Sequence, residues 1–553
     1  MQIPQWLALQ NPEAQGFPVE LNSDEDLYLS RVEEVLSGRP DLAAEAVTGD
    51  PTILPLQSAF LEQVIGLAFA WTHLRAITVL QILDSVLPPL FFLTLFWFLR
   101  LCGFSRRIAF GGALIFFALE LYSLNRSIHQ RDSFLLVLLS LSCILQASKG
   151  PRWLGFLGGT LLGLLVGVYF WSWTFACTFF GLLVLCEFSE WAYGRWHPKD
   201  PHPSLLRRVL DWARKSIAFA REKNTDRPIV AEWQWLLLYG ILGAITSVPF
   251  VWQMLSVSAH PLYDQVLLRL ELIPSRALES PVRSALFFLM TLGLVVVYIR
   301  DYPLLRRYRN AILFVCAAFV VLNQQLIHSI TFLFSSHYLF PLVLAGIMAF
   351  AISVLHVQKS RWLMLSLSGS ILFLAGIAYD ARQAIGQFQT YPERYAEHHL
   401  VGALPALDAL PRTTILSDAD TMRFIMSHTH HDVPYSNRLN YMLIADEDLA
   451  ERYCLAKLPL DAQEWKINAE NVLIYDPDRI ALDPTRRSYE LSLVTAACVR
   501  QSQDPPAALE QYGVAYVLWN EKRQPLWDLQ RLRTDLKKIA GGEGWSLWKM
   551  SRD

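Results

Sequence analysis

Charged residues are scarce in this chain. Asp, Glu, Lys and Arg make up 18% of its 553 residues, whereas roughly a quarter is usual in soluble domains. The net charge is −2, so the positive excess that favours nucleic-acid binding is missing. The 18 Trp, 20 Tyr and 31 Phe exclude disorder, because disordered chains hold few aromatic residues. With 53% hydrophobic residues, the composition indicates a polytopic membrane protein.

Cysteine motifs are also missing. The seven cysteines form no Cys-x-x-Cys pair, and five of them lie in apolar runs. The sequence therefore predicts neither a zinc site nor a framework of disulfides. Only Cys454 and Cys498, which lie outside the apolar runs, are candidates for pairing with each other.

Ten apolar segments fit the pattern of a membrane-spanning helix, which needs about 20 mostly apolar residues. The run 153–187 is too long for one span, and we divide it at residues 169–173 because this polar and aromatic stretch is typical of a membrane interface. The predicted spans are 79–101, 107–123, 133–148, 153–169, 172–189, 234–256, 284–300, 311–327, 338–356 and 362–378. The predicted fold class is therefore an α-helical polytopic membrane protein.

Basic residues recur at alternate connections between these spans. Cytoplasmic loops retain an excess of Lys and Arg, so we expect these connections to face the cytoplasm and both termini to lie outside. The basic connections are 101–107, 149–152, 190–233, 300–309 and 359–361.

Residues 1–55 contain no export signal. They hold ten acidic residues and only two basic ones, with no apolar stretch and cleavage site. Because an external N-terminus requires a segment that carries it across the membrane, we expect that a first apolar helix is missing upstream. The alternative is that the predicted topology is wrong by one helix.

Three domains are predicted. Residues 1–75 form an external acidic segment with amphipathic helices, and residues 76–378 form the transmembrane domain. Within the latter, the cytoplasmic loop 190–233 contains a basic amphipathic helix expected to lie on the membrane surface. Residues 379–553 contain strand-length apolar runs at 413–416, 471–475, 514–519 and 544–549, which indicate an external soluble α/β domain.

An acidic cluster precedes the first helical pattern. Asp24, Glu25 and Asp26 are consecutive, and Tyr28 follows closely. One interpretation is helix capping, since acids in a first turn complement the helix dipole. The other is functional, because a carboxylate beside a membrane can act as a general base or a metal ligand.

With this motif, the sequence resembles the GT-C class of polytopic glycosyltransferases, which includes protein O-mannosyltransferases, aminoarabinose transferases and oligosaccharyltransferase catalytic subunits. Members carry an acidic motif, commonly Asp-Glu followed by Tyr or His, in the first external loop. Asp24, Glu25 and Tyr28 match it. The resemblance extends over nearly the whole chain, because members of the class also have amphipathic external helices, a core of many spans and an external C-terminal domain. The missing first helix is the main departure.

The resemblance implies transfer of a sugar from a polyprenyl-phosphate-linked donor to a protein, lipid or glycan acceptor at the external face of a bacterial inner membrane. Asp24 would be the general base, and Glu25 and Asp26 would support or orient it. Such chemistry requires a base, phosphate neutralisation and positioning. No cofactor is implied with certainty, and a divalent metal, Mg²⁺ or Mn²⁺, stays open.

The second external loop, around residues 124–132, carries candidate phosphate-binding residues. Arg126, His129 and Arg131 suit a phosphate, and Asp132 could be a second carboxylate. The alternative is that they cap helix ends at the interface.

Other candidates lie at the remaining external helix ends. Arg269 is a candidate phosphate contact, and Gln324, His328 and His337 are expected to line a pocket, because polar residues at membrane depth usually face a cavity or a partner. Ordinary interfacial loops are the alternative.

Two patterns in the C-terminal segment are discounted. The cluster 428–432, His-Thr-His-His-Asp, lacks a matching distant ligand pair and is expected to be an exposed loop. Asp418 and Asp420 resemble a DxD motif, but their place between a strand and a helical pattern favours helix capping.

Two rival functions remain. A transporter or flippase of lipid-linked saccharides would carry ionisable groups near the midplane of its spans, and Asp84 and Glu120 are the main ones here. A catalytically degenerate relative is the second rival.

Overall fold

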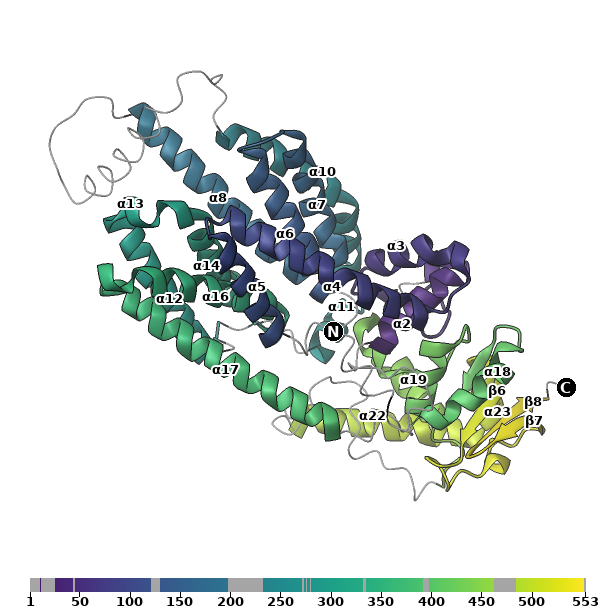
Figure 1. The fold of residues 1–553 in the computed structure, drawn as a ribbon. Helices are drawn as coiled ribbons and strands as arrows, with labels where there is room; N and C mark the ends of the chain where they lie inside the picture. Colours follow the sequence, from purple (N-terminus) through teal and green to yellow (C-terminus); the bar gives the residue numbers. More distant parts are fainter. Residues whose placement is uncertain are drawn as a thin grey trace. The chain divides into compact units, whose positions relative to one another are not determined.

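The computed structural model is mostly helical (Figure 1). It describes residues 10, 25–42, 45–120, 130–196, 232–270, 273–274, 276–278, 280–331, 335–390, 397–461 and 484–551. The chain divides into two compact units. The first unit comprises Met1–Ser85, Trp252–Ile273 and Thr390–Asp553, and the second comprises Val86–Val251 and Pro274–Gln389.

The second unit is a bundle of helices. Within it α14 packs against α8, α12 and α16, and α6 packs against α7 and α8. Three helices, α4, α10 and α17, begin or end in the first unit. The helices are α4 (Ala76–Leu101), α5 (Arg106–Leu119), α6 (Gln130–Ala147), α7 (Trp153–Val168), α8 (Phe170–Trp196), α10 (Glu232–Ser258), α12 (Pro281–Arg300), α13 (Tyr302–Leu305), α14 (Arg309–Leu322), α15 (Gln325–His328), α16 (Leu339–His356) and α17 (Trp362–Thr390).

Each predicted span overlaps one of these helices. Among the described residues, six are long and apolar enough to cross a membrane: α4, α8, α10, α12, α16 and α17. The chain is therefore an integral membrane protein. It stays a prediction that four further helices, α5, α6, α7 and α14, also cross the membrane.

The division of the long apolar run is confirmed. Helix α7 ends at Val168, Tyr169 is extended, and α8 begins at Phe170. The polar and aromatic residues that indicated an interface thus mark the change from one helix to the next.

Glycines allow α7 and α10 to approach closely. Gly155, Gly159 and Gly163 recur every four residues on α7, and a Cβ at Gly159 or Gly163 would collide with the backbone of α10. Small residues at this spacing let membrane helices pack backbone to backbone. The sequence analysis did not single out this repeat.

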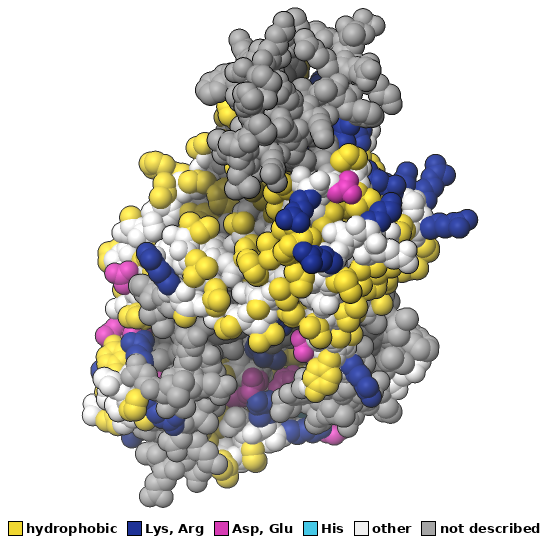
Figure 2. Space-filling view, turned by 90° about the vertical axis from the view of Figure 1, so that its left-hand side faces the viewer, with side chains coloured by type: hydrophobic (Ala, Val, Ile, Leu, Met, Phe, Trp, Pro, Cys, Tyr) yellow, Lys and Arg dark blue, Asp and Glu magenta, His cyan; other side chains and the backbone are white. Residues whose placement is uncertain are grey.

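Apolar side chains cover much of the outer surface of the long helices. Leu93 of α4, Ile245 of α10 and Leu372 of α17 are each more than half exposed. Figure 2 shows a broad area of hydrophobic side chains on one face of the molecule. Such surfaces are typical of helices surrounded by lipid.

The first unit combines helices with a small mixed sheet. The four-stranded sheet has the order β4-β6-β8-β7, with β4 parallel to β6 and the other pairs antiparallel. The strands are β4 (Thr414–Leu416), β6 (Val514–Asn520), β7 (Leu536–Gly542) and β8 (Trp545–Met550), and β1 (Leu54–Pro55) pairs with β5 (Met442–Leu443). The described residues also include the short strands β2 (Ile273–Pro274) and β3 (Ile330–Thr331).

The helices of this unit join the two ends of the chain. Helix α2 packs against α3 and α19, and Leu27 of α2 belongs to the same buried core as Ile415, Ile425 and Val517. The helices are α2 (Glu25–Leu36), α3 (Phe60–Phe69), α11 (Tyr263–Arg269), α18 (Leu404–Asp408), α19 (Ala419–His428), α20 (Asp446–Leu455), α22 (Pro484–Gln503) and α23 (Pro505–Gln511).

Three of the four predicted strand runs coincide with strands β4, β6 and β8. The run 471–475 and the amphipathic pattern of the loop 190–233 around residues 205–219 lie outside the described residues. Cys454 of α20 and Cys498 of α22 form a disulfide, which is the one pairing that the sequence allowed.

Candidate functional site

Asp26, in the first turn of α2, is completely buried and bound by arginine. Its carboxylate accepts hydrogen bonds from Arg438 Nη2 at 2.7 Å and from Arg438 Nε at 3.0 Å, and Arg423 Nε lies 3.5 Å from Oδ2. The side chain of Arg438 is also buried, with 5% of its surface exposed. A carboxylate held in this way is fixed in position.

The other members of the acidic motif lie around Asp26. Glu25 and Tyr28 are buried, with 6% and 3% of their surfaces exposed. Asp24, the predicted base, lies outside the described residues. Since Asp26 is occupied by two arginines, its geometry suits an orienting role better than that of a free base.

Further ion pairs fix the rest of α2. Arg31 Nη1 donates to Glu62 Oε1 of α3 at 3.0 Å, and both side chains are buried. Glu34 accepts from Arg412 at 3.1 Å and lies 2.9 Å from Arg39. Burial outweighs these pairings and raises the pKa of Glu34 to about 8, since a desolvated carboxylate disfavours its charged form.

The sequence analysis missed the arginines that hold α2. Arg438 is separated from Asp26 by 412 residues, and Arg412 and Arg423 are similarly distant. No local spacing links a first-turn carboxylate to residues so far along the chain. Only the folded first unit, in which α2 packs on α19, brings them together.

Arg269, the predicted phosphate contact, is completely buried at the end of α11. Its Nη2 donates to the carbonyl of Ile444 at 2.5 Å, and its Nε lies 3.4 Å from Asp446 Oδ1. Arg486 approaches the other oxygen of Asp446 at 3.5 Å. Burial lowers the pKa of Arg269 to about 10 and raises that of Asp446. Two arginines thus share one carboxylate.

Arg131 and Asp132 lie in the second unit, at the start of α6. Both are buried, and Arg131 Nε donates to Asp132 Oδ1 at 2.8 Å. Arg126 and His129, from the same predicted group, lie outside the described residues. The roles predicted for this loop, phosphate binding and a second carboxylate, stay predictions.

Two predicted groups of the second unit meet at Tyr169, in a set that we call the Tyr169 cluster: Gln130, Tyr169, Trp171 and His337. The Tyr169 hydroxyl is hydrogen-bonded to His337 Nδ1, and Gln130 Nε2 donates to it at 3.5 Å. The imidazole of His337 also lies against the Trp171 ring, with centroids 5.4 Å apart. The cluster joins the start of α6 to the segment before α16.

Gln324 and His328 precede His337 of the Tyr169 cluster in the sequence, but their surroundings in the structure differ. Gln324 Nε2 donates to the Tyr338 hydroxyl at 2.9 Å, and that hydroxyl is 2.8 Å from Thr174 Oγ1. His328 is exposed at the end of α15. Gln324 is therefore tied to the residue after His337, whereas His328 lies at the surface.

The two discounted patterns have different outcomes. Asp418 caps α19 by accepting from Thr421 N at 3.2 Å, so the capping interpretation is confirmed. The prediction of an exposed loop at 428–432 is wrong, because His428 and His431 are buried. His431 is accommodated there by a 2.9 Å hydrogen bond between its Nε2 and the Leu407 carbonyl.

Within the described ranges, no three His, Cys, Asp or Glu side chains are grouped so as to hold a metal ion. The charged groups that come together are pairs of carboxylates and arginines. Such groups can bind phosphate and position a carboxylate, which are the two tasks that the sequence analysis assigned to them.

Comparison with known proteins finds similar solved structures, and two of them are described below. No protein-family model and no curated protein matches the chain. The solved structure of ArnT from Cupriavidus metallidurans bound to undecaprenyl phosphate is 11% identical, with a TM-score of 0.44, and its apo form is 12% identical, with a TM-score of 0.46. Each alignment covers 95% of this chain and 93% of the other. The likeness is one of fold at low sequence identity.

Proposed function

We propose that this protein is an inner-membrane glycosyltransferase that moves a sugar from a polyprenyl-phosphate-linked donor to an acceptor at the external face. The observation that carries the proposal is the arginine-bound acidic start of α2. Asp26 is buried and doubly bound, in a chain with six helices suited to a membrane. Capping alone does not call for two arginines on one carboxylate.

In this proposal Asp24 acts as the general base. It would take the proton of an acceptor hydroxyl while the oxygen attacks C1 of the sugar and the bond from C1 to the phosphate oxygen breaks. The phosphate leaves with the bonding electrons, and the anomeric configuration inverts. Asp26, through Arg438 and Arg423, fixes the helix start that follows Asp24, and Glu25 and Tyr28 flank it.

Cationic groups would neutralise the leaving phosphate. Arg269 is the first candidate, because its Nε and Nη1 are buried without a hydrogen-bond partner among the described residues. Asp446 is its one ion-pair partner among the described residues, at 3.4 Å from Nε. Arg131 is the second candidate, with Arg126 and His129 from the same loop.

The polar groups of the second unit would bind the sugar or the acceptor. The Tyr169 cluster offers hydroxyl, amide and imidazole groups beside aromatic rings, a combination that suits a hydroxylated ligand. We assign His337 and Gln324 to this role, with His328 nearby in sequence and Asp132 as a second carboxylate.

The disulfide supports an external position for the C-terminal segment. Disulfides persist in oxidising compartments such as the bacterial periplasm and are rare in the cytosol. Protein isolated under alkylating conditions should therefore carry Cys454 and Cys498 oxidised. Two alkylated thiols at these positions would contradict the external assignment.

A donor comparison tests the function directly. Membranes that contain the full chain are incubated with a radiolabelled sugar linked either to polyprenyl phosphate or to a nucleotide, and membranes without the chain are the control. The proposal predicts transfer of label from the lipid-linked donor alone. Transfer from the nucleotide sugar, or vectorial movement of intact lipid-linked sugar without transfer, would contradict it.

A further inference from the structure

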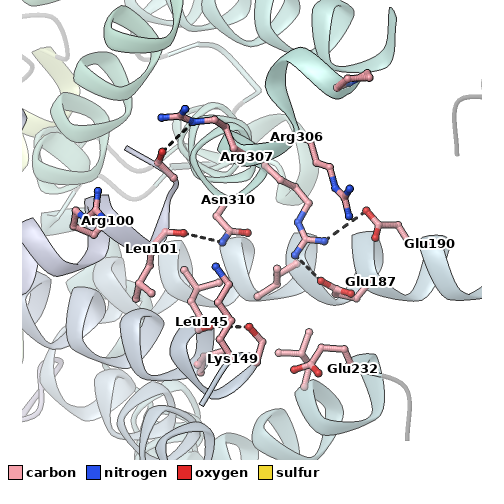
Figure 3. A pocket seen from close by; sticks show the side chains of 17 residues that line it. Arg100, Leu101, Leu145, Lys149, Glu187, Glu190, Glu232, Arg306, Arg307 and Asn310 are labelled. Carbon is pink, nitrogen blue, oxygen red and sulfur yellow. Dashed lines mark hydrogen bonds and ion pairs between the residues drawn. The ribbon is translucent and has the colours of Figure 1, made fainter. Parts of the chain in front are cut away.

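A second polar site lies in the second unit and shares no residue with the groups assigned to transfer. It is a cavity of about 640 Å³, a size usual for small-ligand sites. Its lining comes from the end of α4, the connection from α6 to α7, the end of α8, the start of α10 and the segment from α13 to α14 (Figure 3). These are the helix ends that the predicted topology places at the cytoplasmic surface.

Each carboxylate of this cavity lies beside an arginine. Arg309 Nη2 lies 2.5 Å from Glu187 Oε1, and its Nη1 lies 3.5 Å from Glu190. Glu232 is bound by Arg152, whose Nη1 is 2.8 Å from Oε1. Figure 3 shows both carboxylates of α8 turned toward one guanidinium. The three carboxylates of the lining are therefore paired with only two arginines, Arg309 and Arg152.

Three further cations line the cavity without an ion pair to any described carboxylate: Arg100, Lys149 and Arg307. Arg100 Nη1 donates to the Phe104 carbonyl at 2.6 Å, and Arg307 Nε donates to the Gly103 carbonyl at 3.2 Å. An arginine has five N–H donors, so each of these bonds orients a guanidinium and leaves other donors available. Both arginines are therefore oriented, and the lining as a whole holds five cations against three carboxylates.

Apolar side chains complete the lining. Leu101, Leu145, Leu183 and Leu236 lie beside the charged groups. Cations and leucines together suit an amphiphile whose phosphate meets the arginines and whose chain follows the apolar helices. Basic pockets between membrane helices on the cytoplasmic side are known to hold lipid headgroups.

We propose that this cavity binds a phosphate group and that its occupant is the headgroup of an anionic phospholipid. Arg100, Lys149 and Arg307 contact the phosphate, and the leucines contact the glycerol and the first part of the chain. The site is separate from glycosyl transfer, because none of its residues belongs to the groups assigned to the base, the leaving phosphate or the sugar. It therefore stands whether or not the proposed reaction is correct.

The test measures binding rather than transfer. The full chain in uncharged detergent is titrated with phosphatidylglycerol, with phosphatidylcholine and with inorganic phosphate, and complexes are counted by native mass spectrometry. The test variant is Lys149→Gln with Arg307→Gln, both exposed on the lining. The matched control is Lys359→Gln with Arg361→Gln, which removes the same charges from an exposed connection outside the lining.

The proposal predicts that phosphatidylglycerol binds more tightly than phosphatidylcholine. The test variant should weaken phosphatidylglycerol about tenfold, or about 1.4 kcal/mol, and the control should leave it unchanged. The same selective loss for inorganic phosphate would support the phosphate site with a soluble ligand as its source. Equal weakening in both variants, no weakening, or no preference for phosphatidylglycerol would overturn the proposal.

Discussion

Helix α2 and the Tyr169 cluster use different chemistry to hold their polar residues. In the first unit, α2 is fixed by carboxylates paired with arginines, as in Asp26 with Arg438 and Arg31 with Glu62. In the Tyr169 cluster of the second unit, the polar side chains are held by hydrogen bonds and ring contacts among uncharged or weakly basic groups. Charge therefore fixes the acidic motif, and hydrogen bonds with ring contacts fix the Tyr169 cluster.

This difference predicts how the two regions respond to change. A buried ion pair that loses one member leaves the other charge uncompensated, which is costly. A neutral hydrogen bond contributes far less to stability. Substitutions in the buried ion pairs of α2 should mainly affect folding, whereas those in the Tyr169 cluster should mainly affect binding.

The largest expected effect is that of Arg438→Ala. It leaves the carboxylate of Asp26 completely buried without its main partner, so the free energy of unfolding should fall by about 3 to 5 kcal/mol. Thermal unfolding followed by tryptophan fluorescence measures it. Arg423→Ala is the control, because this half-buried arginine lies 3.5 Å from Asp26 and should cost about 1 kcal/mol or less. Equal losses would contradict the assignment of Arg438.

The next effect is a dependence of stability on pH at Glu34. Burial raises its pKa from 4.5 to about 8, so between these values the folded protein holds a proton that the unfolded chain has lost. The free energy of unfolding should therefore fall as pH rises through this window, by up to about 1.4 kcal/mol per pH unit. Chemical denaturation across the window measures the slope.

Glu34→Gln should reduce this slope without removing it, because burial also raises the pKa of Glu45 and that of Glu490 to about 7. The matched change Glu510→Gln, at an exposed position in α23, should leave the slope unchanged. A slope of the same size in Glu34→Gln would show that another group is responsible.

A smaller effect on stability is expected in the second unit. Tyr169→Phe removes the hydrogen bonds to His337 and Gln130, which should reduce the free energy of unfolding by about 0.5 to 1.5 kcal/mol. The kcat/KM for transfer should fall about tenfold, equivalent to about 1.4 kcal/mol in the barrier. Tyr379→Phe, at an exposed hydroxyl of α17, is the control. Loss of stability without loss of kcat/KM would remove the cluster from the proposed site.

Local patterns predicted the helices well. Each apolar segment overlaps a helix, and the polar and aromatic residues at 169–173 correctly marked the division between α7 and α8. Apolar length and interfacial residues act within a few turns of chain, so a single sequence contains this information. The closeness of α7 and α10, set by Gly159 and Gly163, also had a local signal that was not used.

The contacts of the candidate site could not be predicted in the same way. The pairing of Asp26 with Arg438 joins residues 412 positions apart, and no periodicity reports on such a contact. The buried histidines at 428 and 431 show the converse, because their polar side chains suggested a surface that the tertiary fold covers. Residue type indicated the chemistry, and long-range packing decided which groups meet.

The most direct test of the central claim is glycosyl transfer by Asp24→Asn, measured with a lipid-linked donor beside the unfolding temperature of the same protein. Asp41→Asn, an exposed carboxylate of the same acidic segment, is the matched control. The account predicts that Asp24→Asn abolishes transfer with a stability loss no greater than that of a missing cap, about 0.5 to 2 kcal/mol, while Asp41→Asn retains it. Unchanged turnover in Asp24→Asn would contradict the account.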